Sequence, residues 1–418
     1  MTEENRRKYD AKKKRVEDAI ALKEPDQIPI IASADLFAYS YSGYTVAEVV
    51  YDTSLEKLEK SIVKYMTDFD PDNGAGSGFM LAGEGPMMEL SDPKNMRWAG
   101  MPGDIIDKNS IQQFIEFPVL LEDEFDEFFS DRTGWRLKKQ FPRTSALLEP
   151  LSTIDFVPAF SSARRIAHQF STPDVKKMIE TLWRLDELYN TFQKNSERVA
   201  KTVHDMGFPV FTGSLAGVPF DSYSDNLRGT LLSLSDLYLN PEHVEKFTEA
   251  QHEATLNALR ASKGVNDGCH VFMALHKGMD GFMSDEHYRN YYWKHLQEII
   301  VTIIECGKVP YIYTEGKYNA RLDCLTEVPT GKVFYHFEEV DMAVAKSKLG
   351  SIACIAGGFR STLLDWGTPE QVRDEVKRLI DICAPGGGFI FSPSAGINTN
   401  KAENVEAMFD TLKIYGKY

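Results

Sequence analysis

The sequence predicts an α/β fold, a closed (β/α)8 TIM barrel with an N-terminal helical extension and insertions. The first observation is a stretch at residues 270–341, where three short apolar runs rich in β-favouring residues alternate with connecting segments. The second is that each run ends on ionisable residues, as expected where the carboxyl ends of barrel strands form an active site. The third is that about eight such βα units can be followed along the chain.

The N-terminal half predicts the more decorated part of the barrel. Residues 1–25 are charged and favour an N-terminal helix, and the run IPIIASADLF predicts a first strand that leads into a polar, aromatic loop. Residues 68–85 are rich in Gly and Asp and predict mainly loop. Residues 109–151 predict an acidic, aromatic helical insert. Residues 172–205 predict a long helix covering the barrel, with a proline in its first turn.

The C-terminal half shows the repeat most clearly. The strands predicted there begin with HVFMAL, VPYIYT and KVFYHF, and continue with SIACIAGGF and GGGFIFSPSAGI. The run GTPEQVRDEVKRLIDIC predicts a capped amphipathic helix between the last two strands, and ENVEAMFDTLKIYGKY predicts a closing helix. No linker separates independent domains, so residues 1–418 form one predicted domain.

Composition narrows the class of protein. The formal net charge of −15 argues against a nucleic-acid or anionic-membrane surface, because phosphate binding needs clustered Lys and Arg. No apolar run approaches the roughly 18 residues that cross a bilayer. The cysteines are odd in number and lack C-x-x-C spacing, which indicates reduced thiols and a cytoplasmic protein. They are Cys269, Cys306, Cys324, Cys354 and Cys383.

The candidate catalytic residues follow the three central strands. His276 follows the first, Glu315 lies at the end of the second, and His336 and Glu338 share one face of the third because side chains alternate along a strand. For Glu315 the alternative is a structural ion pair with Arg321, which is either a substrate contact or the residue that orients Glu315. For His276 the alternative is a histidine satisfied within the core.

Two loops offer further pocket residues. The loop after the first strand contains Asp35, Phe37, Tyr39 and Tyr41, and the loop FDSYSDNLRG contains polar side chains, of which Asp225 is the preferred one. The others in that loop are Asp221, Tyr223 and Arg228. Asp35 and Asp225 can each line the pocket or simply cap a turn. Tyr313 and the aromatic residues after the first strand suit an aromatic ligand.

The C-terminal half resembles the uroporphyrinogen decarboxylase superfamily. The resemblance is carried by HKGMDGFMSDEHYRNYYWKHL, the YTEG turn, AGGFRSTLLDWGTPEQVRDEVKRLI and SPSAGINTNKAENVEAMFDTLKIYGKY. It covers residues 205–418 and extends loosely to the rest, and it implies the same barrel as a single domain. Family decarboxylases hold the propionates of a porphyrinogen with arginines at the first strand. Here that strand contains neither Arg nor Lys, which argues against uroporphyrinogen as substrate.

The corrinoid-dependent methyltransferases are the other relevant branch. Their thiol-methylating members bind zinc through His-x-Cys-Gly and a Cys before Gly-Ile, and zinc lowers the pKa of the acceptor thiol. The matching positions here read Tyr313-Thr314-Glu315-Gly316 and Ser394-Ala395-Gly396-Ile397. The departure implies that a thiol is not the acceptor. The resemblance then points to methyltransferases that move a methyl group from a methoxylated compound to cob(I)alamin on a small corrinoid-binding protein.

In such an enzyme the leaving oxygen needs a proton donor or a Lewis acid, and the four residues at the strand ends would serve. Zinc held by Glu315, His336 and His276 is one option, and an acid/base cluster without metal is the favoured one. Gly357, Gly358 and Gly396 are candidates for close approach of the corrinoid, although the first two could only relieve crowding.

The expected function is O-demethylation of a small methoxylated, aromatic compound, and the chain could also pair into a homodimer. The alternatives are a decarboxylase of a porphyrin-like acid, a methyltransferase for methylamine or thioether donors, and a non-catalytic corrinoid or tetrapyrrole-binding protein.

Overall fold

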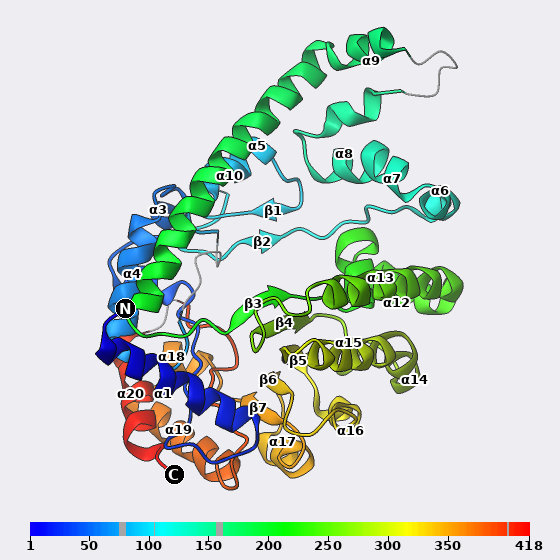
Figure 1. Ribbon diagram of the computed structural model, residues 1–418. Coiled ribbons are helices and arrows are strands. Elements are labelled where there is room, and N and C mark those ends of the chain that lie inside the picture. The colour runs from blue at the N-terminus through cyan, green and yellow to red at the C-terminus, as the bar shows by residue number, and fades with distance from the viewer. Residues whose placement is uncertain (75–80, 104, 156–161, 399–400) are drawn as a thin grey trace.

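The computed structural model describes residues 1–74, 81–103, 105–155, 162–398 and 401–418. Its centre is a parallel five-stranded sheet in which neighbours in sequence are neighbours in space (Figure 1). The strands in spatial order are β3 (Thr212–Leu215), β4 (His270–Leu275), β5 (Val309–Lys317), β6 (Phe334–Glu339) and β7 (Cys354–Gly357).

Three further segments close this sheet into a ring. Residues 389–393 form parallel bridges with β7 on one side and with residues 28–34 on the other. Backbone hydrogen bonds of 2.8 and 2.6 Å then join residues 28–34 to residues 72–74, and residues 72–74 to the chain just before β3. Eight segments therefore surround one axis, and the predicted (β/α)8 barrel is confirmed.

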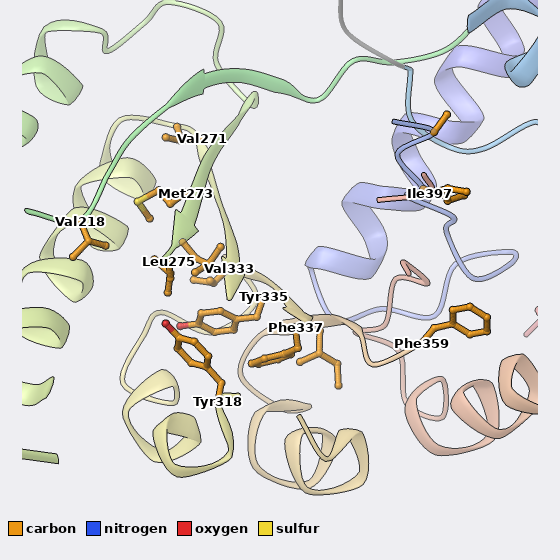
Figure 2. Close-up of a cluster of buried hydrophobic side chains, with 14 of the residues drawn as sticks. Val218, Val271, Met273, Leu275, Tyr318, Val333, Tyr335, Phe337, Phe359 and Ile397 are labelled. Carbon is orange, nitrogen blue, oxygen red and sulfur yellow. The ribbon is translucent and has the colours of Figure 1, made fainter. Parts of the chain in front are cut away.

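Side chains alternate between the two faces of the central strands. Val271, Met273 and Leu275 of β4 and Tyr335 and Phe337 of β6 are buried on the outer face, where they meet the helices around the barrel (Figure 2). Burying a large apolar side chain contributes roughly 1.5–3 kcal/mol, so this outer layer holds strands and helices together. The residues between them face the barrel axis and stay partly accessible at the carboxyl ends of the strands.

The amino-terminal end of the barrel is closed by α1 (Glu3–Ile20), dark blue in Figure 1. Its buried residues Val16, Ala19 and Ile20 join one apolar cluster with Phe334 of β6 and Ile390. The barrel is therefore filled at this end, and among the described residues the inward-facing side chains become partly accessible towards the carboxyl ends of the strands.

The helices around the barrel follow the strands as βα units. They are α4 (Glu56–Phe69), α11 (Pro219–Tyr223), α12 (Thr230–Leu239), α13 (Pro241–Ala261), α14 (Asp285–His287), α15 (Lys294–Glu305), α16 (Leu322–Leu325), α17 (Met342–Leu349), α18 (Thr362–Trp366), α19 (Pro369–Cys383) and α20 (Ala402–Tyr415). Short π-helical turns at Ser224–Arg228 and Tyr288–Trp293 continue α11 and α14, and a 3-10 turn at Asn319–Arg321 leads into α16.

Residues between the second and third barrel segments build an arm beside the barrel (Figure 1). Its elements are α5 (Gly85–Ser91), β1 (Met96–Arg97), β2 (Gln113–Phe114), α6 (Phe125–Ser130), α7 (Arg132–Trp135), α8 (Phe141–Thr144), α9 (Ala163–Phe170) and α10 (Pro173–Asp205), with helical turns at Glu122–Glu124, Arg136–Gln140 and Glu149–Thr153. The helices α2 (Phe37–Tyr41) and α3 (Val46–Val50) follow the first barrel segment.

The long helix α10 forms the spine of this arm, and the prediction that it covers the barrel holds for its C-terminal part, where Val199 and Val203 are buried in the main core. Its 33 residues span about 50 Å at 1.5 Å per residue, which is longer than a barrel is deep. The C-terminal end of α10 lies at the barrel and its N-terminal end lies beside α9. Between the two ends α10 packs against α4 and α5. Among the described residues, no helix is both long and apolar enough to span a bilayer.

Candidate active site

The turn after β4 places His276 at the open end of the barrel. The buried carboxyl of Asp221 accepts hydrogen bonds from the backbone nitrogens of His276 at 3.0 Å and Lys277 at 2.9 Å, and from the Tyr292 hydroxyl at 2.7 Å. Burial raises the pKa of Asp221 to about 6 despite these donors. The carboxyl group of Asp221 therefore holds the turn that carries His276.

His276 itself bridges two carboxylates. Its Nδ1 lies 2.5 Å from Oδ2 of Asp225, and its Nε2 lies 3.7 Å from Oε1 of Glu315. The hydrogen bond to Asp225, with the charges of Glu315 and Asp221 added, raises the pKa of His276 to about 9. The ring is consequently an imidazolium at neutral pH, with one N–H held by Asp225 and the other facing Glu315.

Asp225 also receives a second cation. The Lys277 ammonium lies 3.1 Å from Oδ1 of Asp225 and 3.9 Å from Glu116, which belongs to the arm. Burial opposes ionisation of Asp225, but the His276 hydrogen bond and the Lys277 charge outweigh it and lower the pKa of Asp225. Asp225 is therefore an ionised carboxylate, and the arm reaches the rim of the site through Glu116.

Two glutamates complete this side of the rim. Burial raises the pKa of Glu315, and the charge of Glu338 on the neighbouring strand adds to the shift. Oε2 of Glu338 accepts a 2.5 Å hydrogen bond from the backbone of Gly316, where the register between β5 and β6 shifts. Gly316 has a positive φ of 73°, a backbone conformation that favours glycine at this bend.

Below the rim the barrel has an aromatic floor. The Tyr311 hydroxyl is bonded to Nδ1 of His336 at 2.9 Å, and Nε2 of His336 is bonded to the carbonyl of Pro393 at 2.8 Å. Burial lowers the pKa of His336 to about 4, so the ring is neutral and both nitrogens are occupied. The Tyr313 hydroxyl donates to the carbonyl of Ser394 at 2.9 Å, and its ring lies 4.9 Å from that of His336.

This arrangement separates His336 from the group with which it was expected to act. His276, Glu315 and Glu338 stand together at the rim, whereas His336 has no free nitrogen to exchange a proton with a ligand. Sequence reasoning also overlooked Tyr311 and Phe272, whose rings are 5.1 Å apart on the inner face. Tyr311 lies two residues before Tyr313, and Phe272 lies four residues before His276, so both share a strand face with residues that were predicted. This even spacing could have identified them.

On the opposite side of the mouth lies Asp35, at the end of the first barrel segment. Its carboxyl accepts a hydrogen bond from the Ser33 hydroxyl, and burial raises its pKa to about 7. Burial also raises the pKa of Tyr39 and of Tyr313, and the Asp35 charge adds to both shifts. A Cβ on Gly396 would lie 1.2 Å from Oδ2 of Asp35, so Gly396 makes room for this carboxyl.

Two other predicted residues lie elsewhere. Phe37 is buried in the outer core, stacked on Tyr41 with ring centroids 5.2 Å apart, so it does not line the pocket. Arg321 is bonded to Asp285 and to the carbonyl oxygens of Gly278 and Met283, and not to Glu315. The expectation that Arg321 orients Glu315 is therefore wrong, because the helical turn after β5 points its guanidinium beneath the preceding loop.

The paired glycines after β7 have a local packing reason. A Cβ on Gly357 would lie 1.9 Å from the carbonyl oxygen of Phe337, and one on Gly358 would lie 2.2 Å from Met342. Both have positive φ, at 98° and 73°. Relief of crowding at the strand end accounts for both positions.

Comparison with known proteins places the chain in a family. The family model described as uroporphyrinogen decarboxylase (URO-D) matches residues 166–415. The chain belongs to the uroporphyrinogen decarboxylase family. Proteins named uroporphyrinogen decarboxylase from Neisseria meningitidis (strain FAM18) and Cellvibrio japonicus are 22% and 25% identical to it over 180 and 166 residues. These matches cover 42% and 38% of this chain and 49% and 45% of the relatives, so the chain spans about half the length of the curated relatives it matches.

A solved structure described as a methyltransferase from Methanosarcina mazei has the same fold. It superimposes with a TM-score of 0.59 and covers 97% of this chain and 98% of its own, at 14% sequence identity. At this identity the likeness concerns the fold of the family over the whole length, arm included.

The donor set at the mouth does not suit the zinc site of the family's thiol-methylating members. Both nitrogens of His336 are hydrogen-bonded, Nδ1 of His276 is bonded to Asp225, and Glu315 stands where those members have a cysteine. Within the described ranges, no three His, Cys, Asp or Glu side chains are arranged to hold a metal ion. The rim therefore presents the His276 imidazolium beside several carboxyl groups, and the aromatic side chains below it carry no charge.

Proposed function

We propose that this chain is a methyltransferase that removes the methyl group of a methoxylated aromatic compound and transfers it to cob(I)alamin carried by a small corrinoid protein. The observation that carries the proposal is His276, held as an imidazolium at the mouth by Asp225, with its second nitrogen 3.7 Å from Glu315. Such a group supplies a proton where a leaving oxygen gains charge.

The proposed step is a displacement at the methyl carbon. The acceptor cobalt(I) supplies the electron pair of the new cobalt–carbon bond, and the carbon–oxygen bond breaks with its electron pair on oxygen. The phenolate formed takes the proton of His276, which becomes neutral. A phenol has a pKa of about 10 and His276 one of about 9, so donor and leaving group are closely matched for proton transfer.

The neutral floor supports an aromatic donor. Tyr311, Tyr313, Phe272 and the uncharged ring of His336 present apolar faces inside the barrel, where a ring can stack at a gain of about 0.5–1.5 kcal/mol per pair beyond its burial. The other end of the barrel is filled by α1. Both methyl donor and acceptor must therefore enter at the mouth, with the donor bound first and deeper.

Two similarities bear on this proposal. The matching Methanosarcina mazei structure is described as a methyltransferase, which supports transfer of a methyl group. The curated relatives are named uroporphyrinogen decarboxylase. A porphyrinogen carries several carboxylates, and the rim built by Asp225, Glu315 and Glu338 would repel them.

The test combines the pure protein, a reduced corrinoid protein and a panel of methyl donors. Guaiacol should be converted to catechol, with one equivalent of methylcobalamin absorbance appearing per phenol released. Methylamines, methyl thioethers and uroporphyrinogen serve as comparison substrates. Demethylation of none of the methoxyarenes, or turnover of uroporphyrinogen, would overturn the proposal.

A further inference from the structure

We infer that the site accepts uncharged methoxyarenes, of which guaiacol is the simplest, and rejects methoxylated aromatic acids. This inference rests on the proposed function and concerns the charge of the methyl donor. It follows from the balance of ionisable side chains around the mouth and from which of the cations are already paired.

Carboxyl groups outnumber cations at the mouth. Asp225, Glu315 and Glu338 stand on one side and Asp35 on the other. The cations are His276 and Lys277, on one turn after β4. A ligand carboxylate would add one more negative charge to a site whose own carboxyl groups are in excess.

Neither cation is free to pair with such a ligand. His276 is bonded to Asp225 and faces Glu315, and Lys277 lies between Asp225 and Glu116. An anion could bind either of them only by displacing a carboxylate of the protein, which would then lose its own partner. Leaving a partly buried charge unpaired is costly.

Arg360, which lies outside the mouth, does not change this balance. Arg360 follows β7 and lines a neighbouring rim cleft of about 260 Å³ that shares Glu338 with the mouth. That cleft also contains Glu339, Glu375 and Arg378, so apart from Glu338, which is already counted at the mouth, it holds two guanidinium groups and two carboxylates. The charges of the cleft other than Glu338 therefore cancel, and the excess of carboxyl groups at the mouth is unchanged.

Asp35 makes the far wall hostile to an anion and suitable for a hydroxyl donor. Among the described residues it has no cationic partner, and its hydrogen-bond donor is the Ser33 hydroxyl. The phenolic O–H of guaiacol can donate to it, whereas a benzoate would oppose it. Because the pKa of Asp35 is about 7, the carboxyl is mostly ionised at pH 7.5 but can take up a proton when an anion binds, so its repulsion weakens binding of the anion by roughly 4-fold.

The experiment compares two ligands of one shape. Calorimetry on the full chain, without corrinoid protein, measures the dissociation constants of 2-methoxybenzamide and 2-methoxybenzoate at pH 7.5. The neutral amide should bind at least about 4-fold more tightly than the anion. Equal affinity, or tighter binding of the benzoate, would overturn the inference.

Two charge-removing variants should change the ratio of the benzoate and benzamide dissociation constants in opposite directions. Asp35→Asn should narrow the preference for the amide, because one repelling carboxyl is lost, whereas His276→Gln should widen it, because a cation is lost. Asp126→Asn, on the exposed face of α6, is the matched control and should leave the ratio unchanged. A variant that merely damages the fold weakens both ligands alike, so two shifts in the same direction contradict the inference.

Failure of the inference and failure of the proposed function give different results. If the amide binds more tightly but no methoxyarene is demethylated, the charge preference stands and the methyltransferase proposal falls. If methoxybenzoates are demethylated as fast as guaiacol in the coupled assay, the proposed function stands and the charge preference falls.

Discussion

Replacing Asp225 by asparagine tests the central claim, that Asp225 keeps His276 protonated. Asparagine preserves the size of the side chain and an acceptor for Nδ1–H of His276, but it removes the charge that faces the imidazolium at 2.5 Å. The pKa of His276 should fall from about 9 towards its ordinary value of 6.5. Glu315 and Asp221 still act on the ring, so the value should remain above 6.5.

The size of the fall follows from the surroundings of His276. A carboxylate in contact shifts the pKa of a histidine by about 1–3 units. The side chains of His276 and Glu315 are 39% and 44% exposed, so solvent screens the more distant charges. A fall of about 1–2 units is therefore expected, which places the pKa of His276 in Asp225→Asn near 7–8.

The assay is the pH dependence of demethylation, together with an NMR titration of the His276 ring. In the wild type the imidazolium is present below about pH 9, so the rate should hold up to pH 8 and decline as the pH rises through 9. In Asp225→Asn the decline should begin about 1–2 pH units lower. Lys277→Gln is the control, because loss of this neighbouring cation cannot lower the pKa of His276. Superimposable profiles for Asp225→Asn and wild type would refute the reasoning.

The same ion pair makes stability depend on pH. Because the pKa of folded His276 is raised above its ordinary 6.5, its contribution is complete below about pH 6.5 and is lost as the pH rises through about 9. Tm differences between wild type and His276→Gln should therefore shrink from pH 6.5 to pH 9.5. A difference that stays constant over this range would contradict the assignment of an imidazolium.

Further variants test the parts that hold the site in place. Tyr292→Phe removes one donor from buried Asp221 and should lower the free energy of unfolding in urea by about 1–2 kcal/mol. Gly357→Ala places a Cβ 1.9 Å from a carbonyl oxygen of β6 at a positive φ, so the yield of soluble protein should collapse while Gly103→Ala, with nothing closer than 3.8 Å, keeps most of it. Asp236→Ala removes the buried carboxylate paired with Arg228 but leaves its bonds to Glu122 and to the carbonyl oxygen of Leu120, so it should cost about 2–3 kcal/mol in the same urea titration.

The sequence predicted the barrel where strands are long enough to show a pattern. The runs that became β4, β5 and β6 carry alternating side chains, and the structure keeps that alternation as outer and inner faces. The second barrel segment, residues 72–74, could not be recognised. It is three residues long, lies in a stretch of Gly and Asp, and is held by one backbone hydrogen bond on each side. Ring closure, a property of the whole fold, makes such a segment part of a barrel.

The candidate site, like the barrel, could be predicted only where a local sequence pattern fixes the position of a residue. His276, Glu315 and Glu338 were found because strand ends fix their place, but the partner of His276 could not be chosen from the sequence. Asp225 lies 51 residues away, and only the fold brings the two together. The neutral state of His336 was also hidden, because it depends on burial and on a carbonyl oxygen that is supplied from a different barrel segment, at Pro393.

The position of the ionised rim above the neutral floor also constrains how the methyl donor is oriented in the proposed reaction. In-line displacement requires the acceptor, the methyl carbon and the leaving oxygen to lie on one line. Because α1 fills the far end, the acceptor must come from the mouth, and the oxygen must therefore point inward from the methyl carbon. His276 and Glu315 stand at the strand ends, one step above Tyr313 on the same inner face. The leaving oxygen would therefore lie at the level of His276 and Glu315. The methyl group would face the loops where a corrinoid protein would dock.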